Sequence, residues 1–456
     1  MRHLPKVSLI MPSLNVAPYY AKCMGSATGQ SLRDLEIIAV DAGSTDGTLD
    51  ILKKYAESDS RIIVIHSDKK SYGAQMNLGI EAAKGEYVAF LETDDYLSAY
   101  ALERLYDLAK KDSLDYIKGW TYSFWEETTS SYNVLEDDKI FLNLPMSEDI
   151  FSPRDYPRLL ILDFHVWNGI YKRAFLEKIR FNETAGAAFQ DIGFIIQYVT
   201  QAKSARYIDL PVYWYRRSNE KSSVFSKYGF KYLADEYEKI VKSNIIITDE
   251  RWQFVWYRLL MQLITRFETM YECNEVWLGM ESDLDRIYHL LKNGEINRQL
   301  SCIHDDKIYA RLLSLILNRK YEVLKNSNWL YEPIRKIFEY FANDNVYIYG
   351  AGKRGRMIRD VVLKLGKNPP IAFVDSNPQK WGSIVAGIMV MSLNEAKKNH
   401  PTAKYVIAAK NCEQEIKENL LSSGIVDKNI ICFEELARVW GYNIGKYMKN
   451  ITWVFK

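Results

Sequence analysis

Apolar runs that end in polar residues recur in the first hundred positions of the chain. Residues 7–15, 35–41 and 86–95 each follow this pattern, and helical spacing of apolar residues covers 49–58. Strands that alternate with helices predict a parallel sheet with crossover helices, because parallel neighbours cannot be joined by a tight turn. The front of the chain is therefore expected to be an α/β domain.

The polar ends of these three runs are expected to meet in one crevice. Asn15 closes the first run, Asp41 the second and Asp94 the third. In open parallel sheets, ligands bind beyond the carboxyl ends of the strands. A ligand site built from three separate segments is the prediction.

Three carboxylates, Glu92, Asp94 and Asp95, stand within four residues at the end of the third run. Adjacent like charges at the tip of a buried strand are costly unless a cation neutralises them. Mg²⁺ and Mn²⁺ take oxygen ligands and keep coordination positions open for phosphate. The pattern predicts a divalent metal on Asp94, against the alternative of a solvated turn that caps the following helix.

These segments resemble family 2 glycosyltransferases of the GT-A fold, and the resemblance covers residues 1–226. Its matching stretches occur in the family's order and comprise 7–15, 41–48, 73–79, 83–95, 167–176 and 189–191. The resemblance implies a metal-dependent inverting enzyme that uses Mn²⁺ or Mg²⁺. It would move a hexose-type sugar from a UDP-sugar to a hydroxyl of a glycan or glycolipid acceptor, as in capsule or lipopolysaccharide synthesis.

Carried over residue by residue, the resemblance also implies individual roles. Asp41 would accept a hydrogen bond from the uracil imide, Asp94 would hold the metal, and Asp191 would be the general base. The nucleotide-sugar pocket would be lined by Pro12, Ser13, Asn15, Asp41, Gly73, Asn77, Glu92, Thr93 and Asp94.

Four further side chains are candidates with open alternatives. Arg216 and Arg217 could donate to phosphate oxygens, or form an ordinary solvated basic pair. Trp167 could stack on an acceptor sugar, or be a core indole. Gln190 stands where the family usually has Glu, and it can hydrogen-bond an acceptor but cannot ionise.

Other departures from the family pattern are Ala42, Met76 and Glu92, where Asp, Arg and Asp are usual. Because Asp94 and Asp191 are both present, these departures indicate a distinct subgroup of enzymes. A catalytically silent sugar-nucleotide sensor is the competing interpretation.

Behind this region we expect a helical domain over 227–343, a Rossmann-like domain over 344–440 and a tail over 441–456. The third domain is indicated by a strand, the turn Gly350-x-Gly352-x-x-Gly355, a helical stretch and a strand ending in Asp375. NAD or another nucleotide is its candidate ligand. The runner-up function is accordingly a module that binds a nucleotide-sugar or a dinucleotide, or an oxidoreductase, acting through this domain.

The composition of the chain limits the classes of partner that it is expected to bind. The 456 residues carry 60 basic and 58 acidic side chains, so no overall field favours nucleic acid. Five scattered cysteines, no signal peptide and no long apolar run predict a cytoplasmic protein. Contact with the inner face of the membrane through 319–336, and homo-oligomer formation through the aromatic stretch 252–264, are open alternatives.

Overall fold

The computed structural model describes two compact units. The first comprises Met1–Leu259 with Leu278–Leu290, and the second Leu260–Trp277 with Leu291–Lys456. The described residues are 4–128, 131–137, 149–219, 222–243, 249–273, 276–293, 307–326, 329–330, 345–352, 355–356, 358–359, 369–408 and 412–432. The predicted tail over 441–456 lies outside them, and the predicted borders at 226, 343 and 440 stay predictions.

The first unit is built on one mixed sheet in the order β3-β2-β1-β4-β8-β6-β9-β5, with β7 paired to β6. Strands β3, β2, β1 and β4 are parallel, whereas β8 runs antiparallel to both β4 and β6. The strands are β1 Val7–Ser13, β2 Leu35–Asp41, β3 Ile62–His66, β4 Tyr87–Phe90, β5 Tyr96–Leu97, β6 Tyr116–Thr128, β7 Ser131–Asp137, β8 Gly169–Lys172 and β9 Ala205–Arg216.

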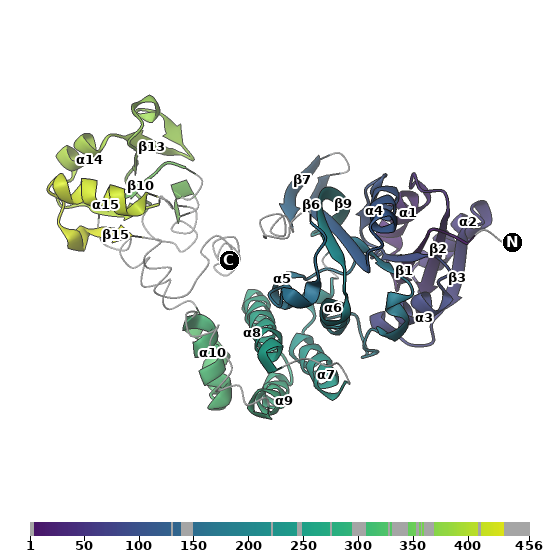
Figure 1. Cartoon of the computed structure of the whole chain (residues 1–456). Helices are drawn as coiled ribbons and strands as arrows, with labels where there is room; N and C mark the ends of the chain where they lie inside the picture. The colour runs from purple at the N-terminus through teal and green to yellow at the C-terminus, as the bar shows by residue number, and fades with distance from the viewer. Residues whose placement is uncertain are drawn as a thin grey trace. The chain divides into compact units, whose positions relative to one another are not determined.

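Every residue of β1, β2 and β4 is buried, as expected for parallel strands covered on both faces. Helix α3 lies against β1 and β2 (Figure 1). The helices of this part are α1 Ala17–Thr28, α2 Thr48–Ser58, α3 Tyr72–Ala82, α4 Ala101–Lys111, α5 Leu159–Leu162 and α6 Gln190–Gln201. The predicted α/β fold with a mostly parallel core is confirmed.

The predicted helical middle region is confirmed by α7 Gly229–Lys242, α8 Asp249–Glu272, α9 Met280–Asn293, α10 Lys307–Leu317 and α11 Tyr321–Leu324. None of the described helices has the length and apolar content needed to cross a membrane.

The second unit contains a smaller α/β sheet. Strands β13, β11, β10, β14 and β15 are parallel in that order, and β12 pairs antiparallel with β13. Its elements are β10 Val346–Tyr349, β11 Phe373–Val374, β12 Ile384–Val385, β13 Ile388–Met391, α14 Leu393–Asn399, β14 Lys404–Ile407, α15 Glu413–Ser422 and β15 Ile430–Cys432. Most of the helical stretch predicted after Gly355 lies outside the described residues.

Candidate active site

Three carboxylates meet just beyond the end of β4. Glu92, Asp94 and Asp95 each place one ligand oxygen within 4.8 Å of the others. Asp95 is buried and is held by β9, because its Oδ2 accepts from the Tyr213 hydroxyl at 2.9 Å and its Oδ1 from the backbone N–H of Arg216 at 2.7 Å. Because both oxygens of Asp95 are occupied, Asp94 is better placed than Asp95 to bind a ligand.

Asp94 is half-buried, and its Oδ2 accepts from Nδ2 of Asn219 at 2.8 Å. Burial, with smaller contributions from the carboxylates of Asp94 and Asp191, raises the pKa of Glu92 to about 8. Burial, with the carboxylates of Asp94 and Glu92, raises the pKa of Asp95 well above its usual range. A cation would relieve this repulsion, and the all-oxygen donor set suits Mn²⁺ or Mg²⁺.

The two arginines at the end of β9, Arg216 and Arg217, make different contacts. Arg216 is buried, and its Nε donates to the backbone oxygen of Asp94 at 2.7 Å. Its guanidinium also lies over the rings of Tyr19 and Phe124. Arg217 is exposed and donates from Nε to Oγ of Ser123. Arg216 therefore contacts the acidic loop, and phosphate contacts by both arginines remain predictions.

Asp41 is almost fully buried at the end of β2 and organises the turn that follows it. Its Oδ1 accepts from the backbone N–H groups of Gly43 and Ser44, both at 2.8 Å. Its Oδ2 accepts from the hydroxyls of Ser13 and Ser44, at 2.9 and 2.6 Å. A carboxylate offers about four acceptor positions, so a uracil imide would have to displace one of these donors. The predicted contact with uracil stays a prediction.

Hydrogen bonds join the end of β1 to the loops that follow β2 and β4. Asn15 has a φ of 56°, and its Oδ1 accepts from the backbone N–H of Thr45 at 2.8 Å. Thr93 donates from its hydroxyl to the backbone oxygen of Pro12 at 2.8 Å. Strands β1, β2 and β4 therefore do bring their polar ends to one edge of the sheet.

Gly73, Asn77 and Gln190 lie in one buried cluster of internal contacts. Gly73 donates its N–H to Oε1 of Gln190 at 2.6 Å, and a Cβ there would lie 2.1 Å from the oxygen of Asn182. Asn77 exchanges hydrogen bonds with the backbone of Phe181. Gln190 is 1% exposed and also donates to Thr184. These contacts fix the segment before α6, and roles in donor or acceptor binding stay predictions.

Trp167 is 5% exposed and stacks with rings on both β9 and its own segment. Its ring centroid lies 4.1 Å from that of Tyr213, 5.3 Å from Tyr215 and 4.2 Å from His165. Of the two sequence-based alternatives, this burial favours the core indole over an exposed sugar platform.

Asp191 is the second residue of α6 and is half-buried. Burial raises its pKa, whereas the positive charges of Arg258 and His165 oppose that rise. The negative charge of Asp191 raises the pKa of Glu92. Asp191 therefore lies within electrostatic range of the acidic cluster. Phe189, just before α6, has a φ of 68°, a conformation that costs energy for an aromatic residue and recurs at functional sites.

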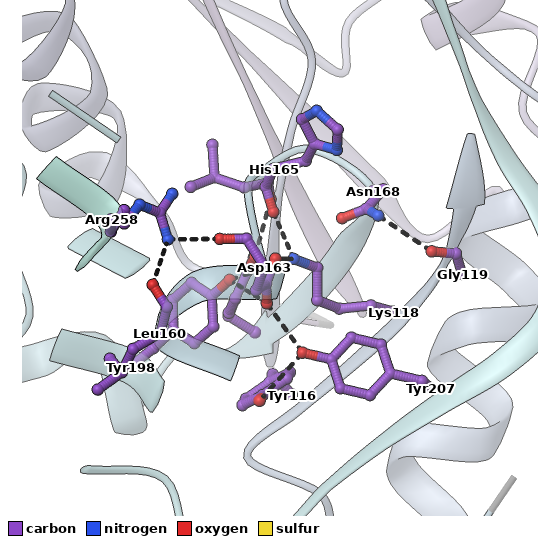
Figure 2. Close-up of polar contacts among 12 residues, drawn as sticks. Tyr116, Lys118, Gly119, Leu160, Asp163, His165, Asn168, Tyr198, Tyr207 and Arg258 are labelled. Atoms are coloured by element: carbon purple, nitrogen blue, oxygen red, sulfur yellow. Dashed lines mark hydrogen bonds and ion pairs between the residues drawn. The ribbon is translucent and has the colours of Figure 1, made fainter. Parts of the chain in front are cut away.

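Figure 2 shows a buried polar network around Asp163 that sequence reasoning missed. Lys118 donates from Nζ to Asp163 and to the backbone oxygen of His165, and both charged side chains are fully buried. The hydroxyls of Tyr198 and Tyr207 donate to Oδ2 of Asp163, at 2.5 and 2.8 Å. Because Tyr198 belongs to α6, the network ties the helix of Asp191 to the segment that carries Trp167.

Arg258 of α8 anchors the same segment from the other side. Its Nη1 donates to the backbone oxygens of Leu160 and Asp163, at 3.0 and 2.7 Å. Sequence reasoning also missed Tyr72, Tyr213 and Asn219, which contact the acidic cluster. For Tyr213 and Asn219 the signal is the aromatic and polar composition of 212–223, which singles out neither of them.

Comparison with known proteins identifies the family. Residues 8–180 match the model of glycosyl transferase family 2, and residues 345–414 match that of the PglD N-terminal domain. The uncharacterized glycosyltransferases EpsJ of Bacillus subtilis and YibD of Escherichia coli are each 30% identical over 237 residues, 51% of this chain and 67% of the relative.

Among solved structures, S. aureus TarS 1–349 in complex with UDP-GlcNAc matches with a TM-score of 0.55 and 17% identity, over 71% of this chain and 91% of that chain. This likeness concerns the fold. With the two relatives and the converging strand ends, it leads to one conclusion: the chain belongs to glycosyl transferase family 2 and is a glycosyltransferase.

Proposed function

We propose that this chain is a metal-dependent inverting glycosyltransferase that moves a hexose-type sugar from a UDP-sugar to a hydroxyl of a surface glycan. The observation that supports it most is the cluster of Glu92, Asp94 and Asp95 beyond β4, with Asp191 close enough to raise the pKa of Glu92. A single displacement needs a site that binds the sugar donor and a general base beside that site.

Asp94 would hold Mn²⁺ or Mg²⁺, with Glu92 beside it toward the ribose. The ion would supply positive charge for the diphosphate as it leaves. Arg216, whose Nε already donates to the backbone of Asp94, would keep the acidic loop in place during binding. Asp95 is bound through both oxygens and would act as a support for the loop.

Asp191 would accept the proton of the acceptor hydroxyl while that oxygen forms its bond to the anomeric carbon. The bond from this carbon to the diphosphate breaks in the same step, which inverts the configuration. A carboxylate whose pKa is raised is a better base than an ordinary one, provided that it remains ionised. The opposing charges of Arg258 and His165 favour that ionised state.

For the second unit we propose a Rossmann-like domain with a nucleotide at the turn after β10. Numbered within the unit, its parallel strands follow the order 3-2-1-4-5 of doubly wound folds. Gly350 has a φ of 110°, and a Cβ on Gly355 would lie 1.9 Å from the oxygen of Gly350, so both positions need glycine. Gly352 has open space around its missing Cβ, as a close ligand would require.

Asp375 adds a constraint on the ligand of that domain. Its Oδ2 accepts from the backbone N–H of Ala351 and from Nζ of Lys380, at 3.2 and 2.8 Å. A ribose hydroxyl would compete with this lysine for the carboxylate, so any nucleotide bound through Asp375 would have to share or displace this contact. NAD remains one candidate to test, and membrane contact and self-association also stay predictions.

A panel of nucleotide sugars tests the main proposal. The purified chain would be incubated with Mn²⁺ and UDP-glucose, UDP-galactose, UDP-GlcNAc, UDP-GalNAc or GDP-mannose, and UDP or GDP release and thermal protection would be measured. We place UDP-GlcNAc first because TarS was crystallised with it. Mn²⁺-dependent release from one UDP-sugar supports the proposal. Binding without release would favour the sensor, and no binding in the panel would contradict both.

A further inference from the structure

Glu236 of α7 is a buried carboxyl group for which the proposed mechanism has no use. Its side chain is 0% exposed, and its Oε1 accepts two hydrogen bonds, from Nδ2 of Asn182 and from the backbone N–H of Gly193, both at 2.9 Å. Asn182 and Gly193 flank the stretch that contains Asp191. One oxygen atom therefore joins the two ends of the segment 182–193.

The contact depends on a close approach of two helices. A Cβ on Gly193 would lie 2.5 Å from Oε1 of Glu236 and 2.8 Å from Nδ2 of Asn182. Gly193 is the fourth residue of α6 and closes its first turn. The carboxyl of Glu236 thus supports the turn from which the side chain of Asp191 projects.

Glu236 has no ion-pair partner among the residues that the structure describes. The charged groups that act on it are Asp191 on α6, which is repulsive, and Lys239 on its own helix. Burial, with a smaller contribution from Asp191, raises the pKa of Glu236 to about 8, although its two hydrogen bonds oppose the rise. Its Oε2 is buried and has no hydrogen-bond partner among the described residues, whereas a second negative charge beside the base would require one.

We propose that Glu236 is a positioning residue for Asp191, whose first helical turn it fixes through Oε1 while remaining a neutral carboxylic acid. This inference depends on the proposed role of Asp191 as the base. It also fits position 190, where a neutral glutamine lies next to the base. A neutral Glu236 on α7 and the neutral Gln190 on α6 then add no negative charge of their own beside Asp191.

The test compares Glu236→Ala, which removes the acceptor, with Glu236→Gln, which keeps an acceptor oxygen but cannot ionise. Glu238→Gln, on the same helix, is the matched control. Amide hydrogen exchange of residues 182–193 is measured at pH 7 without substrate. We expect faster exchange in Glu236→Ala, with protection restored in Glu236→Gln and unchanged in the control.

Turnover is then measured against pH with Mn²⁺ and the UDP-sugar that is most active in the panel. Glu236→Ala should lose about tenfold or more in kcat with unchanged binding of UDP, and Glu236→Gln should restore most of it. Wild-type turnover should fall above about pH 8, where Glu236 ionises, and the Gln variant should lack this fall.

Each outcome decides something. If Glu236→Ala does not fold, the exchange and pH profile of Glu236→Gln still test the inference. The inference would be overturned if Glu236→Ala showed the same amide exchange and the same kcat as the wild type. It would also be overturned if the fall in turnover above about pH 8 persisted in Glu236→Gln. Retained turnover in Asp191→Asn would instead show that Asp191 is not the base. The exchange result would then describe only how Glu236 stabilises the segment 182–193.

Discussion

The Tyr72 hydroxyl donates a hydrogen bond to Oε1 of Glu92 across 3.2 Å. Tyr72 is the first residue of α3, and its ring meets that of Phe181 edge to face. Glu92 stands where the family usually has the shorter Asp. We infer that the extra methylene lets Glu92 reach this hydroxyl, which holds its carboxyl group at the mouth of the donor site.

Tyr72→Phe is therefore expected to weaken donor binding and to leave folding intact. Loss of one hydrogen bond of about 1 kcal/mol corresponds to roughly fivefold weaker binding of UDP in the presence of Mn²⁺. Titration calorimetry would measure it, with Tyr100→Phe on the exposed surface as the control. Equal affinities of the two variants would show that Tyr72 does not position Glu92.

Asp191→Asn should keep binding of UDP and lose turnover by roughly 10²- to 10⁴-fold, because the amide cannot accept the proton. In the wild type, kcat/KM should rise with pH as Asp191 ionises. Since burial raises the pKa of Asp191, this rise should occur above the ordinary range of an aspartate. Stopped-time assays from pH 4 upward would locate it. A variant that turns over like the wild type would exclude this residue as the base.

The buried pair of Lys118 and Asp163 should matter for stability more than any surface pair. Asp163→Asn leaves an uncompensated ammonium in the core and should cost about 3–5 kcal/mol of unfolding free energy. Lys110→Met, which breaks the exposed pair with Glu86, should cost less than about 1 kcal/mol. Urea unfolding compares the two, and similar losses would contradict the burial of the first pair.

Glu236 should also leave a signature in the pH dependence of stability. Its folded pKa of about 8 lies above the ordinary glutamate value of 4.5, so the folded protein retains a proton that the unfolded chain releases in that window. The contribution is full below about pH 4.5 and is lost as pH rises to about 8. Relative to Glu236→Gln, wild-type unfolding free energy should fall by at most about 1.4 kcal/mol per pH unit.

Urea midpoints of both proteins at pH 5, 6.5 and 8 would measure this difference. A constant gap between the two proteins across the three pH values would mean that Glu236 titrates alike in the folded and unfolded states.

The local part of the site was predictable from sequence. Apolar runs that end in Asn15, Asp41 and Asp94 form β1, β2 and the end of β4, because alternation of strands and helices fixes which strand ends meet. The turn role of Asp41 could also have been found, since Asp41, Gly43 and Ser44 are residue types that favour turns.

The contacts between distant segments were not predictable. Tyr213 reaches Asp95 across 118 positions, and its partner is set by β9 lying next to β5, which no spacing in the sequence reveals. Lys118 and Asp163 are residue types that usually lie on the surface, so nothing in their sequence indicates a buried pair. Trp167 likewise could be assigned to the core only when its stacking partners were known.

The central claim is that Asp94 holds the metal that binds the diphosphate of the donor. Titration calorimetry of UDP with and without Mn²⁺ tests it on the wild type, on Asp94→Asn and on Asp107→Asn, an exposed acid of α4. The account predicts Mn²⁺-dependent binding in the wild type and in Asp107→Asn, and loss of the Mn²⁺-dependent part in Asp94→Asn. Mn²⁺-dependent binding of equal strength in all three proteins would contradict it.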